Sequence, residues 1–267
     1  METTVLNELE IGKTYEKMSS GSEGTVYKVD ETTVVKVFDR ITPHKISTKM
    51  DKISILNGKS LPHYATPKRM VVNEVGDPIG YTMEFIIESK IIGNFNMMLN
   101  SNSFSLRVKI EYLQKLQKTL EEAHKQGLTV LDIRSENIIF NQNEEVIIID
   151  TDNFKVGVLE PETLGLCTEL YLKKISPVLD IETDRYNFGV FALELLYGDQ
   201  IIRPQFKPHT NNISLYYSVD MIDIPLCIKE EFKDLFATGT KKRFIGDALE
   251  ELKSDDDFIL KRIKTIK

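Results

Sequence analysis

Val130-Leu-Asp-Ile-Arg-Ser-Glu-Asn-Ile-Ile-Phe140, followed by Glu144-Glu-Val-Ile-Ile-Ile-Asp150, is the stretch from which the fold of this chain can be argued. Its two apolar runs flank the polar turn Asn141-Gln-Asn143 and predict a β-hairpin, whose two ends return side by side. Asp132, Asn137 and Asp150 would then converge on one edge. Carboxylate and amide oxygens suit Mg²⁺ when phosphate groups supply most of its other ligands, so this edge is a candidate metal and phosphate site.

The same residues carry a family resemblance. The pattern D-x-[KR]-x-x-N, with an Asp thirteen positions after the Asn, resembles the catalytic loop and metal-binding Asp of the protein kinases. The resemblance implies that Asp132 accepts or orients the proton of the attacking hydroxyl and that Arg134 neutralises the transferring phosphoryl group. It implies further that Asn137 and Asp150 hold Mg²⁺.

Two departures from the kinase pattern lie in this stretch. Val130 and Leu131 stand where the family usually has His-Arg, and this argues against control by a phosphorylated activation loop. Asp150-Thr-Asp152 stands where the family has Asp-Phe-Gly, so the Asp remains while the Phe and Gly are missing. Asp152 adds a second carboxylate, which could face either metal or solvent.

Composition narrows the classes of protein. The chain has 267 residues, 41% of them hydrophobic, with a net charge of −7 and a pI of about 5.3. This acidic balance gives no electrostatic footprint for nucleic acid or an anionic membrane. The N-terminus lacks the pattern of a signal peptide, and the apolar stretches are too short to cross a bilayer. Two cysteines without metal-ligand spacing suit a reducing cytosol, so we expect a cytoplasmic protein.

Residues 15–38 alternate short β-prone runs with turns and predict an antiparallel meander. Gly21 and Gly24 leave backbone amides open to a polyphosphate, because no Cβ stands in the way. The pattern resembles the glycine-rich loop of kinases, with Ser19 in place of the first Gly and Val26 in the position that would cover adenine. The alternative interpretation is a turn without ligand.

Lys36 lies within the apolar run Val34-Val-Lys-Val-Phe38, where a buried ammonium must be paired or reach out to solvent. It resembles the kinase lysine that holds the α- and β-phosphates of ATP; the alternative is an edge-strand lysine. In kinases that lysine pairs with a Glu on the next helix, but no Glu lies between Lys36 and Leu61. Asp51 is the best carboxylate on the predicted helix, and its alternative is an exposed residue.

Two further strands, residues 68–73 and 79–86, complete a predicted five-stranded sheet. At the end of the second, Met83-Glu84-Phe85-Ile86 resembles the kinase hinge, in which backbone groups bind adenine. The resemblance places Met83, Glu84 and Ile86 among the nucleotide-binding residues; the alternative is an ordinary strand end.

Helical periodicity predicts a long amphipathic helix from Leu106 to Gln126, ended by Gly127. His124, near its end, is interpreted as a packing or capping residue. A second, strongly apolar helix begins near Thr183 and resembles the central helix of the large kinase lobe. By that resemblance Asp184 accepts backbone amides of the catalytic loop; the alternative is a plain N-cap. Two more helices are expected within residues 230–252.

These signals occur in the kinase order along nearly the whole chain, although no Ala-Pro-Glu motif follows Asp150. We therefore expect an α+β, two-lobed protein-kinase-like fold, with a small antiparallel β lobe (residues 1–86) and a larger, mainly helical lobe (87–267). The expected function is Mg²⁺-dependent transfer of phosphate from ATP to a Ser or Thr hydroxyl of a protein. The alternatives are a pseudokinase that regulates partners and a small-molecule kinase of the aminoglycoside or choline type. Neither nucleic acid nor membrane is an expected partner.

Overall fold

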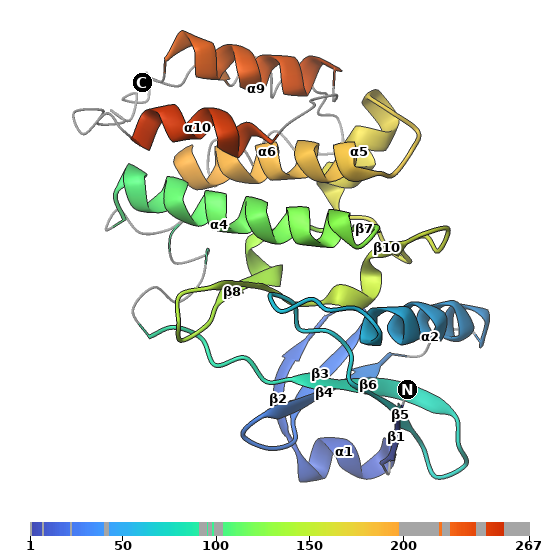
Figure 1. Cartoon of the computed structure of the whole chain (residues 1–267). Helices are drawn as coiled ribbons and strands as arrows, with labels where there is room; N and C mark the ends of the chain where they lie inside the picture. Colours follow the sequence, from blue (N-terminus) through green and yellow to red (C-terminus); the bar gives the residue numbers. More distant parts are fainter. Residues whose placement is uncertain are drawn as a thin grey trace, which may run out of the picture.

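The computed structural model describes residues 2–6, 8–21, 23–39, 43–90, 95, 98, 104–197, 219–220, 225–238 and 244–253. It is an α+β structure with a mixed sheet at one end and stacked helices at the other (Figure 1). The strands of the sheet are β1 (Thr3–Val5), β2 (Glu16–Ser20), β3 (Gly24–Lys28), β4 (Thr33–Phe38), β5 (Arg69–Val72) and β6 (Pro78–Glu84). The helices are α1 (Glu8–Thr14), α2 (Pro43–Asn57), α4 (Leu106–Lys125), α5 (Leu166–Lys174), α6 (Ile181–Tyr197), α9 (Leu226–Thr238) and α10 (Ile245–Lys253).

The sheet has six strands in the order β1-β5-β6-β4-β3-β2. The predicted meander is confirmed, because β2, β3 and β4 pair antiparallel in sequence. The prediction of five antiparallel strands was wrong at the edge, where β1 pairs parallel with β5 from Thr3 opposite Met70 to Val5 opposite Val72. A three-residue strand gives too short an alternation to be recognised in a sequence.

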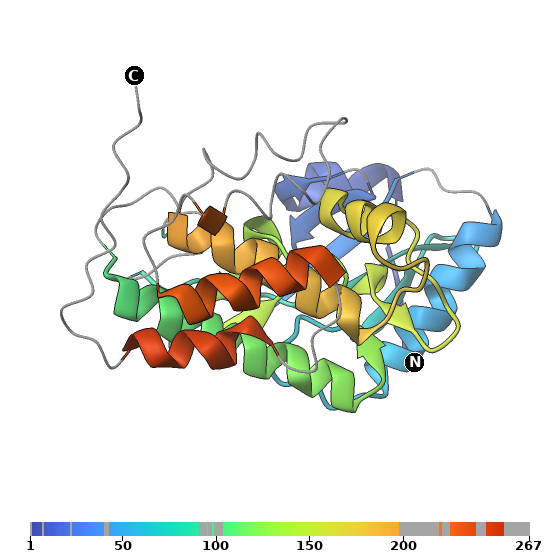
Figure 2. The same cartoon turned by 90° about the horizontal axis from the view of Figure 1, so that it is seen from above.

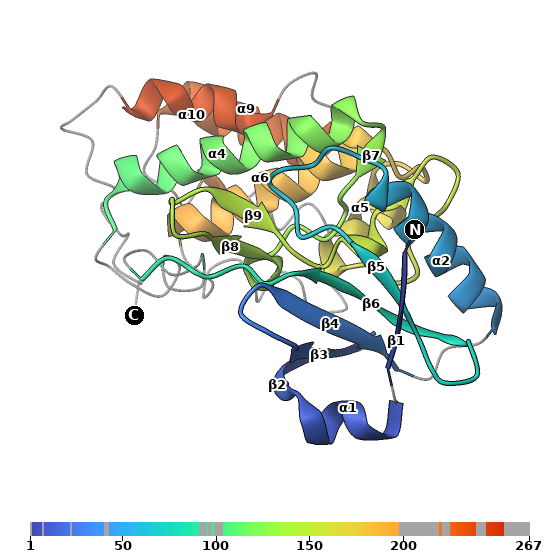
Figure 3. The same cartoon turned by 60° about the horizontal axis from the view of Figure 1, so that its bottom comes forward.

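Each face of the sheet packs against one helix, as Figure 3 shows. Val35 on one face packs in a cluster with Ile11 of α1, whereas Val34 on the other packs with Ile53 of α2. Successive side chains of a strand point to opposite faces, so Lys36 shares the α2 face with Val34. The sheet thus presents this lysine to the interior between sheet and helices.

Helices α4, α6, α9 and α10 run alongside one another and build the largest apolar core (Figure 2). The predicted periodicity of α4 is confirmed, since Leu113, Leu116 and Leu120 are fully buried within it. Gly127 follows with a positive φ of 72°, which ends the helix in the conformation that glycine adopts most readily. The two expected C-terminal helices are α9 and α10.

A hairpin lies between the sheet and the helices. Its strands β8 (Ile138–Phe140) and β9 (Val146–Ile148) pair antiparallel, as predicted, with Ile138 opposite Ile148. Two short strands, β7 (Leu128–Thr129) and β10 (Lys155–Val156), flank it together with the 3₁₀ turns η1 (Ser135–Asn137) and η2 (Thr151–Asn153). The hairpin therefore carries the catalytic-loop sequence to the inner edge of the sheet.

Among the helices that the structure describes, none combines the length and apolar character needed to cross a membrane. Neither Cys167 nor Cys227 takes part in a disulfide within the described part of the chain. Burial raises the pKa of the Cys167 thiol, so this side chain stays protonated near neutral pH.

Candidate active site

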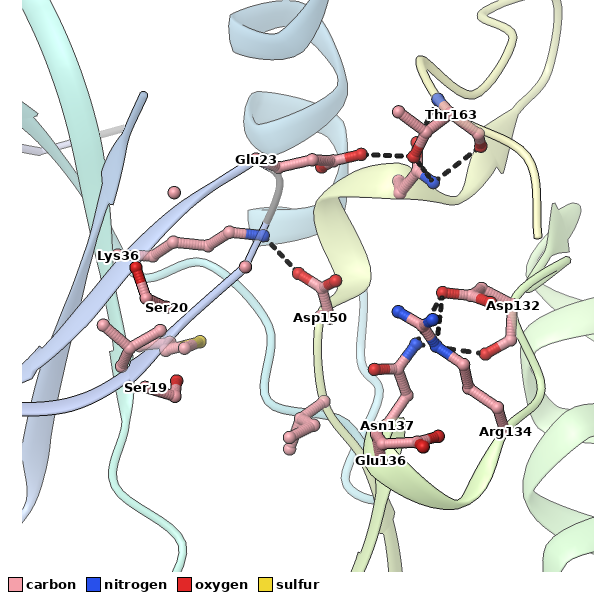
Figure 4. Close-up of a pocket in the computed structure, with 16 residues that line it drawn as sticks. Ser19, Ser20, Glu23, Lys36, Asp132, Arg134, Glu136, Asn137, Asp150 and Thr163 are labelled. Carbon is pink, nitrogen blue, oxygen red and sulfur yellow. Dashed lines mark hydrogen bonds and ion pairs between the residues drawn. The ribbon is translucent and has the colours of Figure 1, made fainter. Parts of the chain in front are cut away.

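A cavity of about 310 Å³ lies between the sheet and the hairpin (Figure 4). Its walls are the β2–β3 turn, strands β3, β4 and β6, the loop before β8 and the residues after β9. Except for Glu84 and Ile86, every residue predicted for the site lines this cavity: Ser19, Gly21, Gly24, Val26, Lys36, Met83, Asp132, Arg134, Asn137 and Asp150. Residues more than a hundred positions apart in the chain thus face one space. Glu84 is exposed and Ile86 packs against the apolar cluster under the sheet.

The β2–β3 turn forms one rim of the cavity. The amide of Gly21 donates to the carbonyl of Gly24 at 2.9 Å and closes the turn. A Cβ at Gly24 would lie 2.3 Å from the carbonyl oxygen of Val37, so this close approach to β4 requires glycine. The packing of Gly24 against β4 therefore excludes a side chain at this position whether or not a ligand binds.

Lys36 is almost fully buried and forms ion pairs with Asp150 and Asp152, the latter at 2.8 Å. Burial alone would lower the pKa of this ammonium, but the two carboxylates outweigh burial and raise it. The edge-strand alternative was wrong, because β4 lies between β3 and β6. Asp51, the carboxylate considered as its partner, is exposed instead. No carboxylate of α2 takes part in the ion pairs of Lys36.

The catalytic-loop residues meet on the opposite side of the cavity. Asn137 Nδ2 donates to Asp132 Oδ2 at 2.7 Å, and Arg134 Nε lies 3.2 Å from the same oxygen. Burial raises the pKa of Asp132, and Arg134 and Asn137 oppose that effect only in part. Because the Asn137 nitrogen is used in this hydrogen bond, its amide oxygen is the atom that can accept from, or coordinate, a ligand.

Asp132 Oδ1 faces the backbone at the start of α5. A Cβ at Gly165 would lie 2.8 Å from this oxygen. Glycine at the N-cap position of α5 therefore leaves open the space beside the carboxylate oxygen that Asn137 and Arg134 do not contact.

Asp184 of α6 accepts backbone amides of the loop before β8, as predicted. It is fully buried and accepts hydrogen bonds from the amides of Val130 at 2.8 Å and Leu131 at 2.7 Å. His124 Nε2 lies 2.8 Å from Asp184 Oδ2 and its ring stacks on Phe244, which confirms the interpretation of this histidine as a packing residue. A buried carboxylate with three such partners fixes the position of the loop.

Leu131 has a positive φ of 67°, in a region that costs a non-glycine residue about 1–3 kcal/mol. Its carbonyl accepts hydrogen bonds from Thr168 Oγ1 and Asn187 Nδ2, both at 2.7 Å, while its amide binds Asp184. Polar contacts from α5 and α6 thereby hold the strained residue directly before Asp132. The side chains of α5 and α6 therefore fix the conformation of the loop before Asp132.

Asp150 follows β9 in the left-handed region, with φ 63° and ψ 51°, and turns its side chain toward Lys36. The pKa of Asp150 is raised to about 6, because burial and the neighbouring Asp152 carboxylate together outweigh the lowering by Lys36. Within the described ranges no three His, Cys, Asp or Glu side chains form a cluster that could hold a metal alone. One carboxylate and one amide oxygen, from Asp150 and Asn137, instead fit a Mg²⁺ ion whose other ligands are phosphates and water.

Asp152 lies away from both solvent and the cavity. It is fully buried, does not line the cavity, and accepts a hydrogen bond from Tyr81 Oη at 2.8 Å. Its two ammonium partners are Lys36 and Lys49, each at 2.8 Å. Burial alone would raise the pKa of Asp152, but these two ammonium groups outweigh it and hold the pKa far below its ordinary value.

Lys49 was not singled out in the sequence, although it links three segments. Its ammonium lies 2.9 Å from Glu23 of the β2–β3 turn and 3.5 Å from Glu162, in addition to Asp152. Thr163 Oγ1 donates to the second oxygen of Glu23. The glycine turn and residues 162–163 are thereby joined on one side of the cavity, as Figure 4 shows for Glu23 and Thr163.

Comparison with known proteins relates part of the chain to a kinase. No protein-family model matches the sequence. A probable serine/threonine-protein kinase of Dictyostelium discoideum, mkcD, is 27% identical over 130 residues. The match covers 40% of this chain and 18% of the relative, so the chain spans only a small part of that protein's length. The α+β structure is compatible with a kinase-like fold.

Proposed function

We propose that this chain is an ATP- and Mg²⁺-dependent phosphotransferase of the protein-kinase type, acting on a Ser or Thr hydroxyl of a protein. The observation that supports it most is that Lys36, Asp132, Asn137 and Asp150 line one cavity beneath a glycine turn. The partial similarity to a serine/threonine-protein kinase points in the same direction. The proposal includes the two-lobed division, with residues 1–86 as the nucleotide-binding lobe and 87–267 as the catalytic lobe.

The proposed reaction breaks the bond between the γ-phosphorus of ATP and its bridging oxygen, and forms a bond from that phosphorus to the acceptor hydroxyl oxygen. Lys36 would hold the α- and β-phosphates, and Asp132 would orient the hydroxyl and take its proton. Arg134, half exposed beside Asp132, would neutralise charge on the transferring group. Asn137 and Asp150 would hold Mg²⁺, which when bound neutralises charge on the phosphate oxygens.

Nucleotide would enter between the glycine turn and the strand end at Met83. In this proposal Val26 covers the adenine, Met83 lines the pocket behind it, and backbone groups near Glu84 and Ile86 bind its edge. Ser19, Gly21 and Gly24 would lie over the phosphates, since their turn forms the rim of the cavity. We also propose a cytoplasmic location, which is inferred from the composition of the sequence.

A pseudokinase is the second candidate, favoured by one observation: Lys36 is paired with Asp150, the proposed metal ligand, while α2 supplies no carboxylate to it. In that case the chain would bind nucleotide and regulate a partner without transferring phosphate.

The deciding experiment incubates the purified chain with γ-labelled ATP and Mg²⁺, alone and with cell lysate, beside Asp132→Ala and Asp150→Ala. We expect label on protein with the native chain and its loss in both variants. Nucleotide binding without transfer would support the pseudokinase instead. Label found only on small metabolites would support a small-molecule kinase, and label that persists in both variants would contradict the assigned site.

A further inference from the structure

The helix that faces Lys36 carries positive charge where an acid was expected. Lys49 of α2 is only 1% exposed, whereas the only acid of this helix, Asp51, is exposed. Lys52 is also buried, but among the described residues its ammonium has no hydrogen-bond partner and burial lowers its pKa, so the buried charge is assigned to Lys49. A buried ammonium must be paired, and Lys49 takes its carboxylates from outside the helix. The buried charge that α2 contributes is therefore positive, whereas a direct partner of Lys36 would have to be negative.

Asp152 supplies the negative charge that both Lys36 and Lys49 require. Its Oδ1 lies 2.8 Å from Lys36 Nζ and 2.8 Å from Tyr81 Oη, and its Oδ2 lies 2.8 Å from Lys49 Nζ. The carboxylate thus stands between the ammonium of β4 and the ammonium of α2. Oδ1 is thus held by two hydrogen bonds, whereas Oδ2 makes no hydrogen bond within the described residues and is compensated by the ammonium of Lys49 alone.

The two carboxylates that contact Lys36 have different surroundings. Asp150 lines the cavity and its side chain is 31% exposed, whereas Asp152 is inaccessible and does not line the cavity. A ligand that draws Asp150 away from Lys36 would leave the lysine paired with Asp152. Lys36 can therefore keep its position while Asp150 changes partner.

We propose that Asp152 is the positioning carboxylate of Lys36, in place of an acid on α2, and that Lys49 is the counter-ion that makes this buried carboxylate possible. The inference rests on the proposed function, since it assigns Lys36 to nucleotide phosphates. It also assigns α2 a part in nucleotide binding, because Lys49 joins Asp152 to Glu23 of the glycine turn.

The test measures binding of the nonhydrolysable analogue AMP-PNP with Mg²⁺, together with KM for ATP and the melting temperature. Asp152→Asn keeps the shape and removes the charge, and we expect it to weaken binding about tenfold or more and to raise KM for ATP. Asp51→Asn is the matched control on α2, where the exposed carboxylate makes the same substitution neutral. Equal affinity in the two variants would overturn the proposal.

A double variant separates positioning from a purely structural role. Lys49→Met combined with Asp152→Asn also takes the ammonium away from Glu23 and Glu162, so we expect a melting temperature no higher than that of Asp152→Asn. Binding should remain about tenfold weak, because Lys36 still lacks its buried partner. Affinity that recovers together with stability would show that Asp152 acts only on the fold, and would overturn the proposal.

Tyr81→Phe decides the matter if Asp152→Asn does not fold. It removes one hydrogen bond to the same carboxylate without changing charge, and we expect binding about threefold weaker; unchanged affinity would overturn the inference.

Failure of the proposed function looks different. A native chain that binds AMP-PNP but transfers no phosphate would refute phosphotransfer and leave the role of Asp152 measurable, whereas a native chain that binds no nucleotide refutes both.

Discussion

The two walls of the cavity are built in different ways. On the hairpin wall, Asp132, Asn137 and Asp150 come from one short stretch, and Asp184 and two polar side chains of α5 and α6 hold it from below. On the sheet wall, Lys36 forms ion pairs with carboxylates from a distant segment, and one of these carboxylates pairs in turn with Lys49. The hairpin wall gains its shape from hydrogen bonds to backbone, whereas the sheet wall gains it from buried ion pairs. Changes of charge should therefore act most strongly on the sheet wall.

The largest effect is expected from Lys36→Met. The substitution leaves Asp150 and Asp152 without their shared ammonium, and removing one partner of a buried ion pair costs about 3–5 kcal/mol of folding stability. We expect affinity for Mg²⁺ and AMP-PNP to fall about thirtyfold as well. Chemical denaturation and calorimetric titration measure the two effects.

Lys28→Met is the matched control for that variant, since Lys28 lies on the neighbouring strand β3 and pairs with the exposed Glu31. An exposed ion pair contributes little to stability. If Lys28→Met and Lys36→Met destabilise the chain equally, the contrast between the walls fails.

A smaller effect is expected from Asp184→Asn on the hairpin wall. The amide weakens two charge-assisted hydrogen bonds to the strained loop, so we expect a loss of about 2 kcal/mol in unfolding free energy. Phosphate transfer should fall while nucleotide affinity stays near native, because Lys36 is untouched. A variant that loses affinity but keeps its turnover would reverse the assignment of roles to the two walls.

The smallest effect is expected from Glu23→Gln, which weakens the link between the glycine turn and residues 162–163. Burial alone would raise the pKa of Glu23, but Lys49 and Thr163 outweigh it and lower the pKa. Ionised Glu23 therefore stabilises the fold above its ordinary pKa, and this contribution is lost as pH falls through the lowered value.

We accordingly expect the native chain to be more stable than Glu23→Gln by about 0.5–1 kcal/mol near pH 7, and the difference to be smaller at about pH 3, since Glu23 takes up a proton as pH falls. Denaturant unfolding at both pH values measures this, with Glu31→Gln on the exposed β3–β4 turn as the control. A difference that grows toward low pH would contradict the assigned ion pair.

How far the sequence predicts the site also differs between the walls. Asp132, Asn137 and Asp150 were predictable because a hairpin of known pattern joins them. The partner of Lys36 was not, because Asp152 lies 116 positions away and two tertiary contacts decide its surroundings. The helix did carry a signal that went unused: Lys49, Lys52, Ile53 and Leu56 follow the i, i+3, i+4, i+7 spacing of a buried face, and Asp51 does not.

Glycine at position 165 has a consequence for the geometry of attack. Two neighbours already bind one oxygen of the Asp132 carboxylate. If Asp132 orients the acceptor hydroxyl as proposed, the hydroxyl would use the other oxygen, beside which Gly165 has no side chain. A Cβ there would lie 2.8 Å from that oxygen, so a larger residue would require the carboxylate to shift. Under the proposed function, the start of α5 would therefore limit the size of the group that carries the acceptor hydroxyl to this oxygen.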